Sequence, residues 1–301
     1  MCGIVGLFAK SPEIELQLGQ HLSAMLVQMS DRGPDSAGVA IYGDSSPVGA
    51  SKLTLFSHDP LENWNALRDT LAEVFGGCSD PQVRASHAVL VVDADADEAE
   101  EWIRTSRPDL RVMSAGRAIE IYKETGLPRQ FAEQFALKDF VGSHGLGHTR
   151  MATESRVTTE GSHPFSTGLD LCLVHNGSLS NHNRLRENLR REGIHFATEN
   201  DTEVAAGYLS WRLHEGASLE QALEGCLGDL DGFFTFLVGT IDGFAVLRDP
   251  IACKPAVLAE TDDWVAMASE WRAIAVLPGA AEARSWEPAP GVVYAWERAT
   301  V

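Results

Sequence analysis

The stretch MCGIVGLF, residues 1–8, places a cysteine directly after the first methionine and continues as a short, apolar, β-prone run. Removal of Met1 would leave Cys2 carrying both a thiol and a free α-amino group. An ordinary α-amine has a pKa of about 7.7–8.0, so it can act as general base toward its own thiol, whose pKa is about 8.5. For an isolated Met-Cys pair, a small core residue or a lipidated cysteine is the alternative interpretation. The rest of the sequence must decide between them.

The apolar pattern after this start predicts further strands and helices. Leucine and methionine spacing predicts one helix over Ile14 to Met29, and the Gly and Pro of DRGPDSAG, residues 31–38, end it before a strand over Val39 to Tyr42. Later segments predict layered sheets packed against helices. Short strands are expected at 171–174, 232–240, 244–247, 256–258, 264–268 and 292–296, and helices at 185–192 and 203–214.

The interval from about Asn63 to Leu137 has a different character and predicts an inserted β-α-β-α segment. Its expected elements are a strand over 85–92, a helix over 95–105, a strand over 110–114 and a helix over 129–136. The acidic residues that open the first of these helices could bind a metal. However, acidic residues at a helix N-terminus favour the helix dipole and are usually solvated, so we expect no metal there.

Composition narrows the classes of function. The chain has 301 residues, 44% of them hydrophobic, and a formal net charge of −19. This charge, without an evident basic patch, argues against binding to nucleic acid or to anionic lipid, so we expect small molecules and protein partners. The five cysteines are scattered, without a C-x-x-C pair, and the sequence shows neither a signal peptide nor a membrane-spanning stretch. We therefore expect a cytoplasmic protein without a cofactor.

Several short motifs occur in a specific order. They are CGIVGLF at 2–8, RGPDSAG at 32–38, GHTRMAT at 147–153, HNG at 175–177 and NDTE at 200–203, followed by RDPIACKP from Arg248 and ASEWRAI from Ala268. Together they resemble the glutaminase domain of class II, N-terminal-nucleophile glutamine amidotransferases, over nearly the whole chain apart from the insert. The resemblance implies an α+β fold, the four-layer α-β-β-α sandwich. It also implies one glutamine amidotransferase domain over 1–301, with an inserted subdomain at about 63–137.

The resemblance also implies roles for individual residues. Cys2 would be the nucleophile and its α-amine the base. The side-chain amide of Asn176 and the backbone N–H of Gly177 would bind the oxyanion of the tetrahedral intermediate, because donors aimed at a developing charge stabilise the transition state. Without the other motifs, an Asn-Gly pair would predict a hairpin turn.

Two charged residues would bind the substrate's α-amino acid group. The planar guanidinium of Arg150 would bind the α-carboxylate through two parallel bonds, and Asp201 would bind the α-ammonium. Asp201 also stands at an expected helix start, so helix capping is an alternative role. Arg32 resembles a pocket residue of the family, and Thr153 would assist in binding the carboxylate.

Three histidines lie in or near the motifs and could be mistaken for bases. Because the α-amine already supplies a base, we interpret them as structural or gating residues. They are His148, His163 and His175.

The sequence departs from the family pattern at Pro34, which resembles the asparagine-synthesising branch, and at Met151, where an aromatic residue is common. These departures bear on the acceptor of ammonia. The motifs end at GVVYAWERATV without a synthase segment, so we expect the acceptor chemistry on another polypeptide. The arrangement resembles the small glutaminase subunit of glutamate-synthase-like complexes, including those that make N-methylglutamate. An independent amidohydrolase acting on another amide and a non-catalytic scaffold subunit are the alternatives.

Overall fold

Strand β1, Gly3–Ala9, lies at the centre of a seven-stranded antiparallel sheet in the computed structural model, which describes residues 2–152 and 157–298. Side chains alternate between the two faces of a strand. Val5 and Leu7 pack against helices, whereas Ile4 and Phe8 pack against a second sheet. Because β1 is buried on both faces, its sequence is a continuous apolar run.

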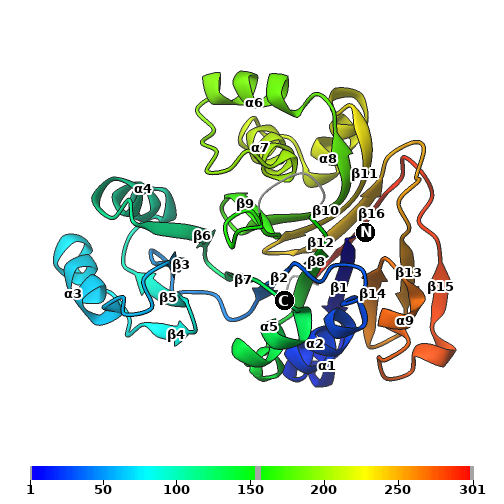
Figure 1. Ribbon diagram of the computed structural model, residues 1–301, viewed down its shortest axis with the longest axis horizontal. Helices are drawn as coiled ribbons and strands as arrows, with labels where there is room; N and C mark the ends of the chain where they lie inside the picture. The colour runs from blue at the N-terminus through cyan, green and yellow to red at the C-terminus, as the bar shows by residue number, and fades with distance from the viewer. Residues whose placement is uncertain (1, 153–156, 299–301) are drawn as a thin grey trace.

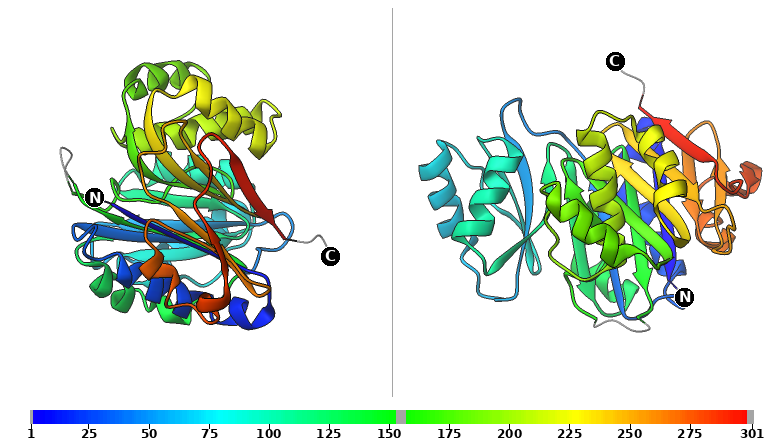
Figure 2. Two further views of the ribbon diagram at one scale, coloured as in Figure 1. Left: turned by 90° about the vertical axis from the view of Figure 1, so that its right-hand side faces the viewer. Right: turned by 90° about the horizontal axis from the view of Figure 1, so that it is seen from above.

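The main body is a stack of four layers, α-β-β-α, visible from bottom to top in Figure 1 and again in Figure 2. One hydrophobic core joins the lower helices to the first sheet, a second lies between the two sheets, and a third joins the second sheet to the upper helices. The expected four-layer sandwich is confirmed. The lower helices are α1 (Pro12–Leu16), α2 (Leu18–Gln28), α5 (Pro128–Gln134) and α9 (Trp271–Ile274); the upper ones are α6 (His182–Arg191), α7 (Asp201–His214) and α8 (Leu219–Asp229).

The two sheets of the body are antiparallel throughout. In spatial order the first is β15 (Arg284–Trp286), β13 (Val257–Glu260), β14 (Trp264–Ala268), β1, β8 (His144–Arg150), β2 (Ser36–Tyr42) and β7 (Ile119–Thr125). The second is β16 (Val293–Glu297), β12 (Gly243–Arg248), β11 (Gly232–Thr240), β10 (Leu171–Leu179) and β9 (Phe165–Gly168).

The helix expected over Ile14 to Met29 is divided into α1 and α2 at Gln17. The backbone N–H of Gly19 donates to Phe140 O at 2.9 Å, so this donor serves a contact with the 137–140 turn. A Cβ at Gly19 would lie 2.1 Å from Leu137 O, which shows how closely the two segments approach. The apolar spacing is therefore correct, but a tertiary contact interrupts the helix.

A separate four-stranded sheet lies at the left of Figure 1. Its chain order is βαββαβ, the split βαβ arrangement, and α3 and α4 share one apolar core with it. The interval expected from sequence, 63–137, needs correction: it omits β3 and includes β7 and α5, which belong to the main body. The unit consists of β3 (Ser51–Ser57), α3 (Trp64–Phe75), β4 (Gln82–Arg84), β5 (His87–Val92), α4 (Ala96–Ser106) and β6 (Leu110–Gly116).

Within the described part of the chain, every helix is too short or too polar to cross a membrane.

Candidate active site

A cavity of ≈ 860 Å³ opens where the start of β1, the end of β8, strand β10 and the N-terminus of α7 meet. Four of the residues predicted to act in catalysis or substrate binding line it. They are Cys2, Arg150, Gly177 and Asp201. Residues that are far apart in the chain thus converge because the two sheets bring strand ends to one edge.

Cys2 precedes β1, and two side chains hold its backbone. Its carbonyl oxygen accepts from Arg32 Nε at 2.9 Å and from Asn176 Nδ2 at 3.1 Å. Its Sγ lies 3.4 Å from Met151 N and accepts a hydrogen bond from this backbone N–H. The backbone of Cys2 is therefore held by Arg32 and Asn176, and its thiol contacts Met151 at the cavity.

Asn176 is buried, and its side chain has a defined orientation. Nδ2 also donates to Ser269 Oγ at 3.0 Å, and the same oxygen accepts from Ile4 N at 2.9 Å. Asn176 lies within β10, opposite Thr235 of β11, so the Asn-Gly pair does not form a hairpin turn. Hydrogen bonds to Cys2 O, and through Ser269 Oγ to Ile4 N, join this amide to the start of β1.

Gly177 has a backbone that other residues rarely adopt, with φ of 151°. A Cβ at this position would lie 1.8 Å from Phe233 O. Glycine is therefore required on both conformational and steric grounds, and it exposes the backbone to the cavity.

Arg150 and Asp201 lie at element ends that face the cavity. Arg150, the last residue of β8, is 6% exposed, and its Nη1 donates to Gly161 O at 3.1 Å. Asp201 is the first residue of α7, but the capping bond comes from Asn200, whose side chain accepts from Thr202 N at 2.8 Å. Asn200, and not Asp201, therefore caps the helix.

The position of the Asp201 carboxylate is set from β10. Its Oδ2 accepts a hydrogen bond from Leu179 N at 2.9 Å, two residues beyond Gly177. The start of α7 and the end of β10 are thereby joined at the cavity wall.

Two buried histidines, His163 and His175, line the cavity, and a third, His148, packs against His163. The rings of His148 and His163 stack with centroids 4.0 Å apart, and His175 Nδ1 lies 3.0 Å from Thr202 Oγ1. Burial lowers the pKa of all three, that of His148 to about 3. Neutral, packed rings at neutral pH support a structural role.

The two remaining residues predicted to bind substrate are Arg32 and Thr153. Arg32 contacts the backbone of Cys2 and pairs with Glu270, whose carboxyl pKa it lowers, rather than lining the cavity. Thr153 lies outside the described residues. Sequence reasoning missed the roles of Ser269 and Met151, although both belong to quoted motifs.

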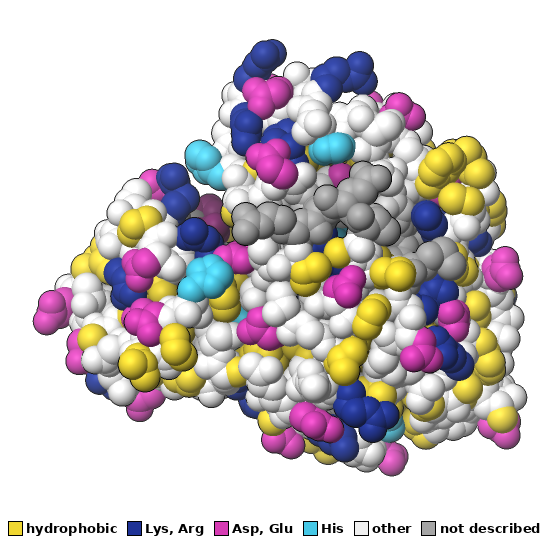
Figure 3. Space-filling view, viewed as in Figure 1, with side chains coloured by type: hydrophobic (Ala, Val, Ile, Leu, Met, Phe, Trp, Pro, Cys, Tyr) yellow, Lys and Arg dark blue, Asp and Glu magenta, His cyan; other side chains and the backbone are white. Residues whose placement is uncertain are grey.

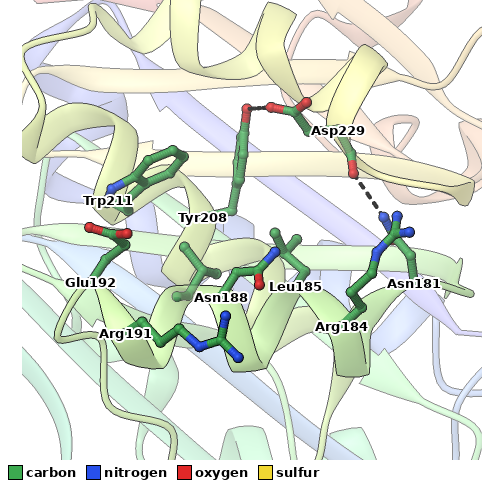
Figure 4. A pocket seen from close by; sticks show the side chains of 10 residues that line it. Asn181, Arg184, Leu185, Asn188, Arg191, Glu192, Tyr208, Trp211 and Asp229 are labelled. Carbon is green, nitrogen blue, oxygen red and sulfur yellow. Dashed lines mark hydrogen bonds between the residues drawn. The ribbon is translucent and has the colours of Figure 1, made fainter.

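A second hollow, of ≈ 500 Å³, lies on the outer helices and is shown in Figure 4. Tyr208 donates to Asp229 Oδ2 at 2.6 Å and Asn181 donates to Asp229 O at 2.8 Å, so these bonds join α6, α7 and α8. None of the predicted site residues lies in this wall among the residues described.

Comparison with known proteins agrees with this geometry. Residues 148–276 match the family described as "Glutamine amidotransferase domain". The glutamine amidotransferase-like protein GlxB of Rhizobium meliloti (strain 1021) is 57% identical over 298 residues, covering 99% of this chain and 98% of that protein. An amidophosphoribosyltransferase of Archaeoglobus fulgidus is 35% identical over 49% of this chain and 34% of its own length.

A solved structure shares the fold. The glutamine phosphoribosylpyrophosphate amidotransferase of B. subtilis superposes with a TM-score of 0.63 at 20% identity. The match covers 98% of this chain but 47% of the other, so this chain spans about half the length of that enzyme. With the motifs, the sandwich and these relatives in agreement, the chain belongs to the class II glutamine amidotransferases and is an enzyme of that family.

Proposed function

We propose that the chain is a glutaminase subunit that hydrolyses the side-chain amide of glutamine through a thioester on Cys2. Once Met1 is removed, the α-amine accepts the thiol proton while sulfur attacks the amide carbon. The amide N–H of Asn176 and the backbone N–H of Gly177 stabilise the oxyanion. The proton then passes to the leaving nitrogen, ammonia departs, and water hydrolyses the thioester to give glutamate.

One observation carries this proposal. Cys2 and Gly177 line the same cavity as Arg150 and Asp201. The opposite charges of Arg150 and Asp201 match the two charges of a free α-amino acid, which supports the proposal. The other enzymatic candidate, an amidohydrolase for another amide, would not need both. Purified protein should release glutamate and ammonia from glutamine in equal amounts. Hydrolysis of simple amides but not of glutamine would instead support the independent amidohydrolase.

Replacement of Asp201 by Asn should mainly weaken glutamine binding. A hydrogen bond to a charged group is worth about 1.5–3 kcal/mol, so KM for glutamine should rise roughly ten- to a hundredfold. The value of kcat should change less, because the α-ammonium does not react. Steady-state assays over a range of glutamine concentrations measure both.

Asp231→Asn is the matched control, because Asp231 accepts from Ser180 Oγ at 2.7 Å but does not line the cavity. An unchanged KM in Asp201→Asn, or the same change in both variants, would contradict the assignment of Asp201.

We also propose that a synthase-type protein receives the ammonia, in a complex of the glutamate-synthase or N-methylglutamate-synthase kind. Ammonia released into water at neutral pH is mostly protonated and no longer nucleophilic, so transfer between docked sites is favoured. The net charge of −19 favours a partner with a basic face. Lys and Arg side chains gather over α6 at the top of Figure 3. An acidic surface that binds the basic face of a partner should therefore lie elsewhere on the molecule.

The four-stranded unit over 51–116 is our candidate for the gating element. His58, just beyond β3, contacts the Glu160 carboxylate, and Arg111 of β6 lines the cavity itself. The unit thus reaches the wall of the site. A partner that contacts it can shift the population of the competent cavity.

Glutamine turnover should therefore be slow in the isolated chain and should rise by about tenfold or more when the partner is added, a coupling of about 1.4 kcal/mol. His58→Ala should reduce this stimulation while leaving isolated turnover unchanged. His214→Ala, an exposed histidine at the end of α7, is the control. Full turnover without any partner would contradict the complex.

A further inference from the structure

One loop, residues 158–164, contacts several parts of the proposed glutamine site. Gly161 O accepts from Arg150 Nη1 at 3.1 Å and from Asn200 Nδ2 at 3.4 Å. His163 Nδ1 accepts from His175 N at 3.4 Å, one residue before Asn176. The loop therefore joins the proposed carboxylate-binding arginine, the start of α7 and the oxyanion strand.

The ammonium group of Lys123 is hydrogen-bonded to the backbone of this loop. Lys123 belongs to β7 and is 4% exposed. Its Nζ donates to three loop carbonyls, Glu160 O at 3.1 Å, Ser162 O at 3.0 Å and Pro164 O at 3.2 Å. An ammonium has three N–H donors, so each can be matched to one carbonyl. The carbonyl groups of every second residue, 160, 162 and 164, are thereby bound to one ammonium group.

The space around this contact leaves the loop little freedom. Lys123 Nζ lies 4.6 Å from the centroid of the Phe165 ring, directly after the loop. A Cβ on Gly38 of β2 would lie 2.1 Å from His163 O, so the loop rests directly on the sheet. The loop is held by close packing on one side and by a buried cation on the other.

A buried cation is costly unless it is well solvated by the protein. Burial lowers the pKa of Lys123 to about 8, while the nearby carboxylates of Glu203 and Glu160 raise it. Glu203 holds another part of the cavity wall, since its carboxylate accepts from Ala197 N at 2.7 Å and from Thr198 N at 2.8 Å. Two buried charges of opposite sign therefore each fix one wall.

We propose that Lys123 is a positioning residue for substrate binding: it fixes the 158–164 loop so that Gly161 O orients the Arg150 guanidinium toward the α-carboxylate of glutamine. This inference rests on the proposed glutaminase function. Lys123 itself does not line the cavity and acts through the loop. A planar guanidinium binds a carboxylate well only in one orientation, so a small rotation of Arg150 weakens binding.

Lys123→Met tests this role, because it keeps an unbranched chain and removes the charge and all three donors. KM for glutamine should rise roughly tenfold or more, with kcat changed by less than about threefold, because the substrate's carboxylate does not take part in the reaction. Lys52→Met is the matched control. Lys52 is also buried, donates to Asp44 O at 2.8 Å and Glu120 Oε1 at 3.0 Å, and does not line the cavity.

Covalent labelling of Cys2 separates positioning from general damage. Iodoacetamide should alkylate Lys123→Met and wild type at the same rate, whereas a glutamine analogue with a diazoketone in place of the amide should label the variant more slowly. If KM stays at the wild-type value, or rises equally in Lys52→Met, Lys123 only stabilises the fold and the inference fails. Equal slowing with both reagents would also overturn it.

If Lys123→Met does not fold, Lys123→Gln carries the same test, since it keeps an N–H donor without the charge and should still raise KM for glutamine above the wild-type value. A wild-type KM in this folded variant would overturn the inference. The proposed function fails by a different result, the absence of glutamine hydrolysis in the wild-type protein.

Discussion

Replacement of Cys2 by Ala is expected to abolish glutamine hydrolysis, with a loss on the order of 10⁴-fold or more. In the proposed mechanism the thiol forms the covalent intermediate, and no other side chain has been assigned that role. The structure supports this expectation by placing Cys2 Sγ in the cavity wall, held by Met151 N at 3.4 Å. The ammonia released from glutamine is the measurement.

The control for this variant is Cys253→Ala, which removes an exposed cysteine outside the cavity wall. It should retain full activity. Glutamine binding to Cys2→Ala, measured by calorimetry, should persist, because the charged groups proposed to bind the amino acid are intact. Activity that survives in Cys2→Ala would contradict the thioester mechanism.

The proposed mechanism also requires that Cys2 be the N-terminal residue of the active protein. The α-amine can act as base only if Met1 has been removed, so intact mass spectrometry of active protein should show a chain starting at Cys2. A fully active chain that retains Met1 would leave the reaction without its proposed base.

Much of the fold could be predicted because its strands are buried on both faces and read as apolar runs. Gly232–Thr240 and Trp264–Ala268 have the expected bounds. Strand β8 was not expected, because its glycines carry no strand signal. They are required by packing: a Cβ at Gly145 would lie 2.8 Å from Leu22, and one at Gly147 would lie 2.8 Å from Val5.

Local patterns also failed where long-range contacts determine the element. Strand β3 pairs with β5 and β6, both distant in sequence, so the start of the inserted unit could not be located from composition. The candidate site, too, could be predicted only in part from local sequence patterns. Cys2 and Gly177 were predicted from motifs and line the cavity, whereas Lys123 has no motif and its proposed role depends on the loop packed on it.

Asn176→Ala is expected to reduce kcat by roughly a hundred- to a thousandfold, the usual effect of losing one oxyanion donor. The side chain is buried, with Nδ2 3.1 Å from Cys2 O and 3.0 Å from Ser269 Oγ, so the amide is hydrogen-bonded before substrate arrives. Both N–H groups of the amide are engaged here, so one of them must turn from Cys2 O or Ser269 Oγ to the oxyanion as charge develops. Because this bond forms only with the developing charge, its loss acts on the transition state more than on binding.

KM for glutamine should therefore change little in Asn176→Ala, in contrast to Asp201→Asn. Asn181→Ala is the matched control, because Asn181 makes comparable hydrogen bonds to Asp229 O and Asp231 N at the outer hollow. It should keep wild-type kcat even if it loses stability. Circular dichroism and thermal unfolding show whether each variant is folded at the assay temperature. A folded Asn176→Ala with wild-type kcat would remove Asn176 from the oxyanion hole and leave the backbone N–H of Gly177 as its proposed donor.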